Sequence, residues 1–175
     1  MDAPPPDGLA RERHLAYSRG QRFVFRYTVQ GCLVTLLALG LLNVFGARPA
    51  VNRAESDVAR LEVKAPTTVR GGLFFEGRFR IDAREALEHA TLVLDPGWQK
   101  ELSINTIEPA PIGESSRDGR LELDFGAVRP GGSIVAYLQF QVNPSQFRTR
   151  RAQGVSLADG DRELLRIDRS LTVFP

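Results

Sequence analysis

The feature that most constrains this chain is a stretch without a charged side chain, Tyr27–Ala47. As an α-helix, these 21 residues would measure about 30 Å, which is the thickness of the hydrocarbon core of a bilayer. Leu, Val and Phe dominate its centre, and the polar Gln30 and Asn43 lie near its ends. A helix in a soluble core normally keeps a polar face, and this stretch shows none. The sequence therefore predicts a transmembrane helix over residues 23–47.

The flanks of this stretch favour an uncleaved signal anchor over a cleaved signal peptide. A signal peptide has a short charged region, an apolar core of about 7–15 residues and small residues at its cleavage site. Here 26 residues precede the apolar stretch, and Arg48 and Pro49 follow it where cleavage would be expected. We therefore expect the helix to remain in the mature protein.

Arginines on the two sides of the stretch predict its orientation. Five lie in the last 16 residues before it, whereas three lie in a comparable length after it. Because positively charged flanks stay in the cytoplasm, we expect a cytoplasmic tail over residues 1–22, disordered at its proline-rich start. The C-terminal domain is then extracytoplasmic. The predicted location is the cytoplasmic membrane, with the lipid bilayer as a partner of a single-pass helix.

Beyond the helix, apolar residues recur at every second position, as in a strand with one buried face. In the stretch 134–142, for example, Ile134, Leu138 and Phe140 share the apolar face. Glycine-containing turns such as Gly131-Gly132 separate the alternating stretches, as expected between antiparallel strands. In a second stretch, the apolar face is formed by Leu73, Phe75, Gly77, Phe79 and Ile81.

Seven or eight strands of this kind predict a mainly β fold. After a linker over residues 48–58, we expect an immunoglobulin-like antiparallel β-sandwich over residues 59–175. A small β-barrel is the alternative, because alternation does not distinguish an open sheet from a closed one. The single cysteine, Cys32, lies within the predicted helix, so the domain folds without a disulfide.

The residue types argue against catalysis, a cofactor or a metal. The two histidines, His14 and His89, lie on opposite sides of the predicted helix, and the domain has no cysteine. A site built from Cys and His ligands therefore cannot form. No G-x-S-x-G motif accompanies His89, which leaves no basis for a nucleophilic triad. Asp159, Asp161 and Glu163 surround a turn, where solvated acids are favoured over a calcium site.

The charge balance argues against nucleic acid as a partner. The net charge is +2, and all of this excess lies in the first 26 residues. From Arg48 onward, basic and acidic residues are equal in number. Because a nucleic-acid-binding domain concentrates positive charge on its own surface, we interpret the arginine excess as a topology signal.

Five side chains of the domain are candidates for contact with a partner. The basic cluster over residues 148–151 suits an acidic surface. Phe74 lies on the polar face of its strand beside Phe75, where it contacts a partner unless a β-bulge turns it inward. The sole tryptophan lies at a turn, and together with Tyr137 it would suit a sugar. The candidates are Arg148, Arg150, Arg151, Trp98 and Phe74.

The helix carries a stripe of small residues that would let a second membrane helix approach closely. Spacings of about three to four residues place them on one helix face. The candidates for helix packing are Thr28, Gly31, Thr35 and Ala38.

One segment and the overall layout carry a resemblance. The segment Leu123–Ser133 resembles the hairpin of bacterial immunoglobulin-like surface repeats, and Leu171–Pro175 looks like a final sandwich strand. The whole layout resembles small bacterial single-pass proteins with one extracytoplasmic immunoglobulin-like domain. Arg outnumbers Lys 21 to 2, which fits a GC-rich bacterial genome. Copper-delivery proteins of oxidase assembly share the layout, but they need a paired-cysteine motif that this domain lacks.

A complete fold signal without a catalytic constellation predicts a non-enzymatic interaction or scaffold protein, displayed outside the cytoplasmic membrane. We expect it to be an accessory to an envelope or membrane complex, with another envelope or membrane protein as its partner. A cell-wall or carbohydrate-binding module is the alternative, and it depends on exposed aromatic side chains.

Overall fold

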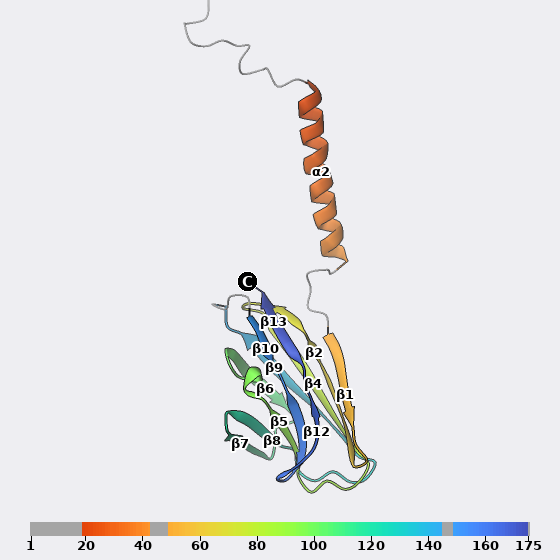
Figure 1. Cartoon of the computed structure of the whole chain (residues 1–175), viewed down its shortest axis with the longest axis vertical. Helices are drawn as coiled ribbons and strands as arrows, with labels where there is room; N and C mark the ends of the chain where they lie inside the picture. Colours follow the sequence, from red (N-terminus) through yellow and green to blue (C-terminus); the bar gives the residue numbers. More distant parts are fainter. Residues whose placement is uncertain (1–18, 43–48, 145–148, 175) are drawn as a thin grey trace, which may run out of the picture. The chain divides into compact units, whose positions relative to one another are not determined.

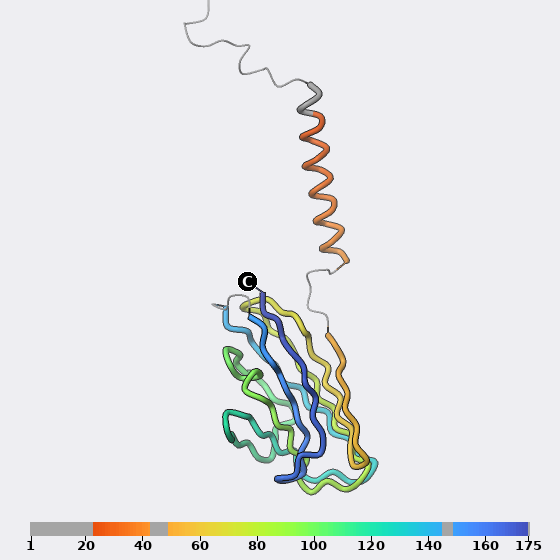
Figure 2. The backbone as a smooth tube through the Cα atoms, viewed as in Figure 1, coloured from red at the N-terminus to blue at the C-terminus, as the bar shows by residue number. Residues whose placement is uncertain are grey.

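The computed structural model describes residues 19–42, 49–144 and 149–174, and Figure 2 traces the backbone. Clustering of contacts divides the chain into two compact units, residues 1–46 and 47–175. Each unit is described by itself.

The first unit contains a long apolar helix, α2 (Arg19–Leu41), drawn in orange in Figure 1. Its part Phe23–Leu41 is long and apolar enough to cross a membrane, and no residue of this part is buried. The helix therefore has the length and composition that the uncharged stretch predicts. The end of the predicted span, at residue 47, lies outside the described residues.

The second unit consists almost entirely of strands, with one short 3-10 turn, η1 (Pro96–Trp98). This confirms the predicted fold class, an apolar N-terminal helix followed by a mainly β domain. The strands are β1 (Pro49–Glu55), β2 (Ala59–Pro66), β3 (Thr68–Arg70), β4 (Phe74–Ala83), β5 (Ala90–Leu94), β6 (Leu102–Glu108), β7 (Gly113–Arg117), β8 (Arg120–Asp124), β9 (Ser133–Val142), β10 (Thr149–Ala152), β11 (Val155–Asp159), β12 (Arg162–Ile167) and β13 (Ser170–Phe174).

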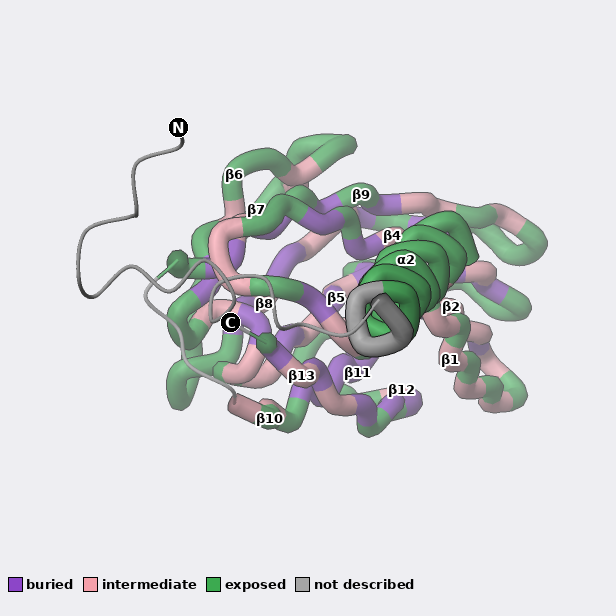
Figure 3. Tube along the Cα trace, turned by 90° about the horizontal axis from the view of Figure 1, so that it is seen from above, coloured by how far each residue is buried: buried purple, intermediate pink, exposed green. Residues whose placement is uncertain are grey.

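Hydrogen bonds join these strands into three sheets. The strand orders are β1-β2-β4-β9-β6, β10-β13-β3 and β12-β11-β5-β8-β7. The pairs are antiparallel except for β3 and β13, which run parallel. Seen from above, β2, β4 and β9 lie opposite β11, β12 and β13, with buried segments between them (Figure 3). Since each of these sheets begins and ends with an edge strand, the described domain is a sandwich and not the alternative closed barrel.

Alternating side chains from the facing sheets fill the space between the layers. Phe79 and Phe140 of one layer and Leu92 and Leu157 of the other belong to the same cluster of buried residues. Full burial of a side chain of this size contributes about 1.5–3 kcal/mol. The core therefore drives folding of this unit without a disulfide.

Three features differ from the sequence prediction. The described strands outnumber the seven or eight expected, because short strands such as β7, whose residues are all exposed, lack apolar alternation. Residues 49–55 form strand β1, whereas a linker was expected over 48–58. Leu73 does not share the inner face with Phe75, because it precedes β4 and is half exposed.

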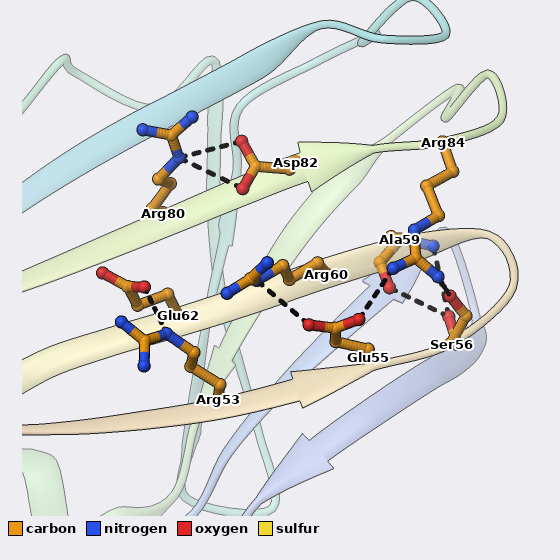
Figure 4. A network of polar contacts seen from close by, with 9 residues as sticks. All are labelled: Arg53, Glu55, Ser56, Ala59, Arg60, Glu62, Arg80, Asp82 and Arg84. Carbon is orange, nitrogen blue, oxygen red and sulfur yellow. Dashed lines mark hydrogen bonds and ion pairs between the residues drawn. The ribbon is translucent and has the colours of Figure 1, made fainter.

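The outer face of β1, β2 and β4 carries a network of ion pairs (Figure 4). Hydrogen bonding by Arg53 lowers the pKa of the Glu62 carboxyl. Charged side chains on an edge strand such as β1 oppose pairing with a second molecule. Exposed pairs of this kind contribute at most about 1 kcal/mol each, so the network protects the edge more than it stabilises the fold. The pairs are Arg53–Glu62 (2.6 Å), Arg84–Glu55 (2.7 Å), Arg80–Asp82 (2.9 Å) and Arg60–Glu55 (3.3 Å).

Candidate functional site

An acidic cleft of about 310 Å³ opens beside strands β5, β7 and β8 and the turn between β11 and β12. β8 pairs antiparallel with both β5 and β7, and this pairing brings the side chains that line the cleft together from distant parts of the chain. The charged and nucleophilic groups that line the acidic cleft are His89, Glu114, Ser115, Glu122, Asp124 and Asp161.

Hydrogen bonds fix His89 at the edge of the acidic cleft. Its backbone N–H donates to Asp159 Oδ1 at 2.8 Å, and its ring Nδ1 lies 2.9 Å from Asp124 Oδ2. Asp124 also accepts from the backbone N–H of Gly126 at 2.7 Å. The pair forms because Thr91, two residues after His89, lies opposite Asp124 in the β5–β8 register. Sequence reasoning missed it, since 35 positions separate the two residues.

The acidic cleft presents negative charge and hydrogen-bond acceptors to solvent. The hydroxyl of Ser115 donates to Glu122 at 2.8 Å, so it is engaged with a carboxylate. Arg117 forms an ion pair with Asp161 at 3.3 Å, and this hydrogen bond raises the pKa of the guanidinium. The His89 side chain is 58% exposed. In the described part of the chain, no group of three His, Cys, Asp or Glu residues is placed to hold a metal ion.

Trp98 is buried and cannot be the surface contact that its turn position suggested. It ends η1, and its exposed fraction is 0%. Its ring centroid lies 5.3 Å from that of Phe79 and 5.1 Å from that of Phe140. Its indole N–H donates to the Gly154 carbonyl at 3.1 Å. A tryptophan can enter a core when its N–H finds such an acceptor, and this contact comes from a residue 56 positions away.

Arg169 lies inside the domain against Trp98, a placement that sequence reasoning did not predict. Its guanidinium carbon is 4.9 Å from the centroid of the indole ring. Its Nη2 donates to the carbonyl oxygens of Ala65 at 3.2 Å and Pro66 at 2.6 Å. Burial lowers the pKa of Arg169 to about 10. Backbone carbonyls and an aromatic face therefore solvate this cation in place of water. The sequence signal that could have indicated its burial is its position within an otherwise apolar stretch.

The basic cluster is not one continuous surface. Arg148 lies outside the described residues. Arg150 is exposed on β10 and stays a candidate for partner contact. The side chain of Arg151 is only 8% exposed, because it forms an ion pair with Glu101 and donates to the carbonyl of Lys100. Arg151 therefore fastens β10 to the residues before β6, and its predicted role in binding a partner is corrected to a structural one.

Phe74 points outward at the start of β4. It is 57% exposed, whereas Phe75 is buried. The β-bulge alternative is wrong, because β4 and β9 keep a regular register from Phe74 to Asp82. Leu73 and Phe174 are also exposed, and the backbone N–H of Gly71 joins the two segments by donating to the Phe174 carbonyl at 2.8 Å. Leu73, Phe74 and Phe174 together are called the end patch. Partner contact by Phe74 stays a prediction.

The stripe of small residues lies on an exposed part of α2. The hydroxyl of Thr28 donates to the Val24 carbonyl at 2.9 Å, and that of Thr35 donates to the Gly31 carbonyl at 2.8 Å. These hydroxyls therefore bond within their own helix. A side chain added at Gly31 would meet no other atom within 4 Å. Packing of a partner helix against Thr28, Gly31, Thr35 and Ala38 stays a prediction.

Comparison with families and curated proteins yields no match to this chain. Several solved structures share a similar course of the backbone. The cohesin module of a family 33 glycoside hydrolase from Clostridium perfringens has 13% identity and a TM-score of 0.45, covering 68% of this chain and 98% of its own.

Two further solved structures are similarly distant. AvmM, which catalyses macrocyclization in alchivemycin A biosynthesis, has 10% identity and a TM-score of 0.45, covering 73% of this chain and 97% of its own. The CARDB domain of the PF1109 protein from Pyrococcus furiosus, solved with di-metal ions, has 12% identity and a TM-score of 0.40, covering 71% and 88%. At these values no function transfers to this chain.

Proposed function

We propose that this chain is a single-pass membrane protein whose β-sandwich binds another envelope or membrane protein, as a non-enzymatic accessory or scaffold. The observation that carries the proposal is the exposed apolar helix. Large side chains such as Phe25, Leu33 and Leu37 are more than half exposed along it. In water this surface would be strongly unfavourable, whereas a bilayer covers it at no comparable cost.

The orientation in this proposal follows from the arginines. Five precede the helix within 16 residues, and three follow it over a comparable length. This bias favours a cytoplasmic N-terminus and an extracytoplasmic β-sandwich. The domain then acts outside the cytoplasmic membrane.

The surface of the sandwich supports binding to a protein. Its core is filled by its own side chains, and the outside offers the end patch, the exposed Arg150 and the acidic cleft. The carbohydrate-binding alternative is weaker than it was on sequence grounds, because buried Trp98 is unavailable to stack on a sugar. Tyr137, the other aromatic on which it depended, is 40% exposed on β9.

Membrane anchoring is tested by alkaline extraction of membranes that contain the full chain. We expect the wild type to stay in the membrane pellet. A double variant, Leu33→Arg with Leu37→Arg, should move to the soluble fraction, because each charge near the helix centre disfavours insertion by about 2.5–3.5 kcal/mol. The matched control, Leu33→Ile with Leu37→Ile, should behave as the wild type. Release of the wild type by alkali would contradict anchoring.

The interaction role is tested by crosslinking in native membranes, followed by gentle solubilisation and recovery of the full chain. We expect one partner protein in stoichiometric amount. Its crosslinks should map to the extracytoplasmic domain or to the helix. Recovery of the chain without a stoichiometric partner would contradict the scaffold role and leave the anchoring result standing.

A further inference from the structure

The end patch concentrates exposed apolar surface at one end of the sandwich. Leu73 is 50% exposed, Phe74 57% and Phe174 37%. Leu73 directly precedes β4, Phe74 is the first residue of β4, and Phe174 is the last residue of β13. Gly71 and Phe174 are joined by a backbone hydrogen bond, so the three side chains belong to one region. Exposed apolar groups that gather in this way mark a contact surface.

This end of the sandwich is also the end at which the chain enters it. Pro49, the first residue of β1, lies opposite Pro66. The next residue, Thr67, accepts a hydrogen bond from the backbone N–H of Thr172. Two residues later, Phe174 lies beside Arg70 in the β13–β3 register. Figures 1 and 2 show the start of β1 and the end of β13 at the same end of the domain.

The length of the connection points to the occupant of the end patch. Six residues, 43–48, link the described part of the helix unit to β1. The seven steps from Leu42 to Pro49 reach at most about 25 Å even when fully extended. If the helix crosses a bilayer, which is the proposed function on which this inference rests, the entry end of the sandwich cannot leave the neighbourhood of the lipid surface.

The charged residues near the end patch include two exposed arginines and the exposed Glu76 of β4. Arg70 and Arg150 are exposed near the end patch, on β3 and β10. The acidic cleft belongs to the opposite end, because β4 runs from Phe74 to Ala83 and Ala83 is bonded to Gly131 and Gly132. After Ala83 the chain continues to Leu87, whose backbone is hydrogen-bonded to that of Val128. Leu87 lies two residues before His89 of the acidic cleft. Cations near the end patch suit anionic lipid headgroups. The carboxylates of the acidic cleft lie far from these headgroups and are not repelled by them.

We propose that the end patch inserts into the headgroup layer of an anionic bilayer, so that the sandwich stands on the membrane by its entry end. Leu73, Phe74 and Phe174 supply the apolar contact, and Arg70 and Arg150 face the lipid phosphates. The membrane then contacts the protein at two places, the helix and the end patch. The acidic cleft faces away from the lipid and stays open to a partner.

The test places a fluorescent side chain in the end patch of the full chain. Phe74→Trp is reconstituted into vesicles of phosphatidylcholine and phosphatidylglycerol whose acyl chains carry bromine, a short-range quencher. The native Trp98 is buried, and its signal is subtracted with the wild type. We expect the added tryptophan to lose at least about half of its emission, as for a side chain lying about 5–10 Å into the interface.

The matched control is Ile112→Trp, which puts the same probe on an exposed apolar residue, 73% exposed, away from the end patch. Its backbone bonds to Asp124 of the acidic cleft, and its emission should be unaffected by bromine. Leu73→Trp gives a second reading of the end patch if Phe74→Trp fails to fold. Equal quenching of the end-patch and control probes would overturn the inference. Absence of quenching at both positions would also overturn it, and is the result expected if the end patch binds a protein instead of lipid.

Flotation of the same vesicles separates the two levels of the proposal. If the full chain floats with lipid but the end-patch probes are not quenched, the docking inference fails and the anchoring stands. If the chain does not float, the proposed function fails and the docking inference falls with it.

Discussion

At the scale of single residues, the contact between Trp98 and Arg169 dominates the interior. The indole fills the space between Phe79 and Phe140 and covers a guanidinium that lies in the core. Burial lowers the pKa of Arg169, and none of the ion pairs between described residues involves Arg169. This pair therefore combines the favourable burial of an indole ring with the cost of burying a cation. Mutation of one residue or the other separates these two effects.

Removing the indole should strongly destabilise the domain. We expect Trp98→Ala to lower the free energy of unfolding by about 3–5 kcal/mol, because it leaves a cavity in a packed core. Urea denaturation followed by circular dichroism measures this loss. Tyr137→Ala, on the surface of β9, serves as the control and should change stability by less than about 1 kcal/mol. Equal effects of the two variants would contradict the central place of Trp98.

The buried charge predicts an unusual dependence of stability on alkaline pH. The pKa of Arg169 is about 10 in the folded protein, below the pKa of an arginine exposed to water. The unfolded state therefore binds the proton more tightly, and the cost of burying the charge applies fully below about pH 10 and is relieved as the pH rises further. Relative to Arg169→Met, the wild type should gain about 1 kcal/mol per pH unit above that point.

Denaturant unfolding of both proteins at about pH 8 and about pH 11 checks this dependence. Arg150→Met, at an exposed arginine, is the control. The change in its free energy of unfolding with pH gives the contribution of lysine and tyrosine titration, which is subtracted. A constant difference between wild type and Arg169→Met across this range would contradict a perturbed guanidinium.

These residue contacts also show the limit of sequence reasoning about the candidate site. Arg151 and Glu101 are 50 positions apart, and Trp98 and Gly154 are 56 apart. Neither pairing follows from local pattern, so the sequence alone predicts that Arg151 and Trp98 lie on the surface. Strand alternation favours an outward Phe74 beside an inward Phe75, but only the regular pairing of β4 with β9 excludes the β-bulge that would turn Phe74 inward.

At the scale of elements, strands with large apolar residues could be predicted and strands held by backbone pairing could not. In β4 and β9, alternate residues such as Phe79 and Phe140 mark the buried face. β1 pairs with β2 along its whole length, from Pro49 to Glu55, but its side chains are small, polar or only half buried. It therefore has the composition of a linker, and only its hydrogen bonds make it a strand.

The turn η1 is a tight element that should not tolerate a side chain at Gly97. A Cβ atom at this position would overlap the carbonyl oxygen of Ala152. We expect Gly97→Ala to destabilise the domain by about 2 kcal/mol or more, since backbone would have to move in a packed region. The melting temperature measures this effect.

The control for this substitution is Gly113→Ala, where the added Cβ would make an ordinary contact of 3.6 Å with Asp124. Its melting temperature should stay close to that of the wild type. If Gly97→Ala were equally stable, close packing of η1 against β10 would be contradicted.

At the scale of the whole molecule, the chain combines a helix suited to lipid with a domain that holds its own core. Every member of the buried cluster lies between Ala59 and Val173, so the helix contributes nothing to it. The stability of the sandwich should therefore be independent of the helix.

This independence predicts that residues 49–175 fold alone. We expect a chain of this length to give a β-type circular dichroism spectrum and a single cooperative unfolding transition, as small domains with one core do. Its melting temperature should match that of the domain within the full chain in detergent. A spectrum without β structure, or a molten state that binds a hydrophobic dye, would contradict it.

The shared end of Pro49 and Phe174 has a consequence for rearranging the gene. Nearby termini allow circular permutation, in which a short peptide joins the old ends and new ends are cut elsewhere. The new ends could lie in the turn at Asp159-Gly160, between β11 and β12, because Gly160 is exposed there. A permutant opened there and fused to the helix would present the sandwich to the membrane by its opposite, acidic end, with every strand still paired.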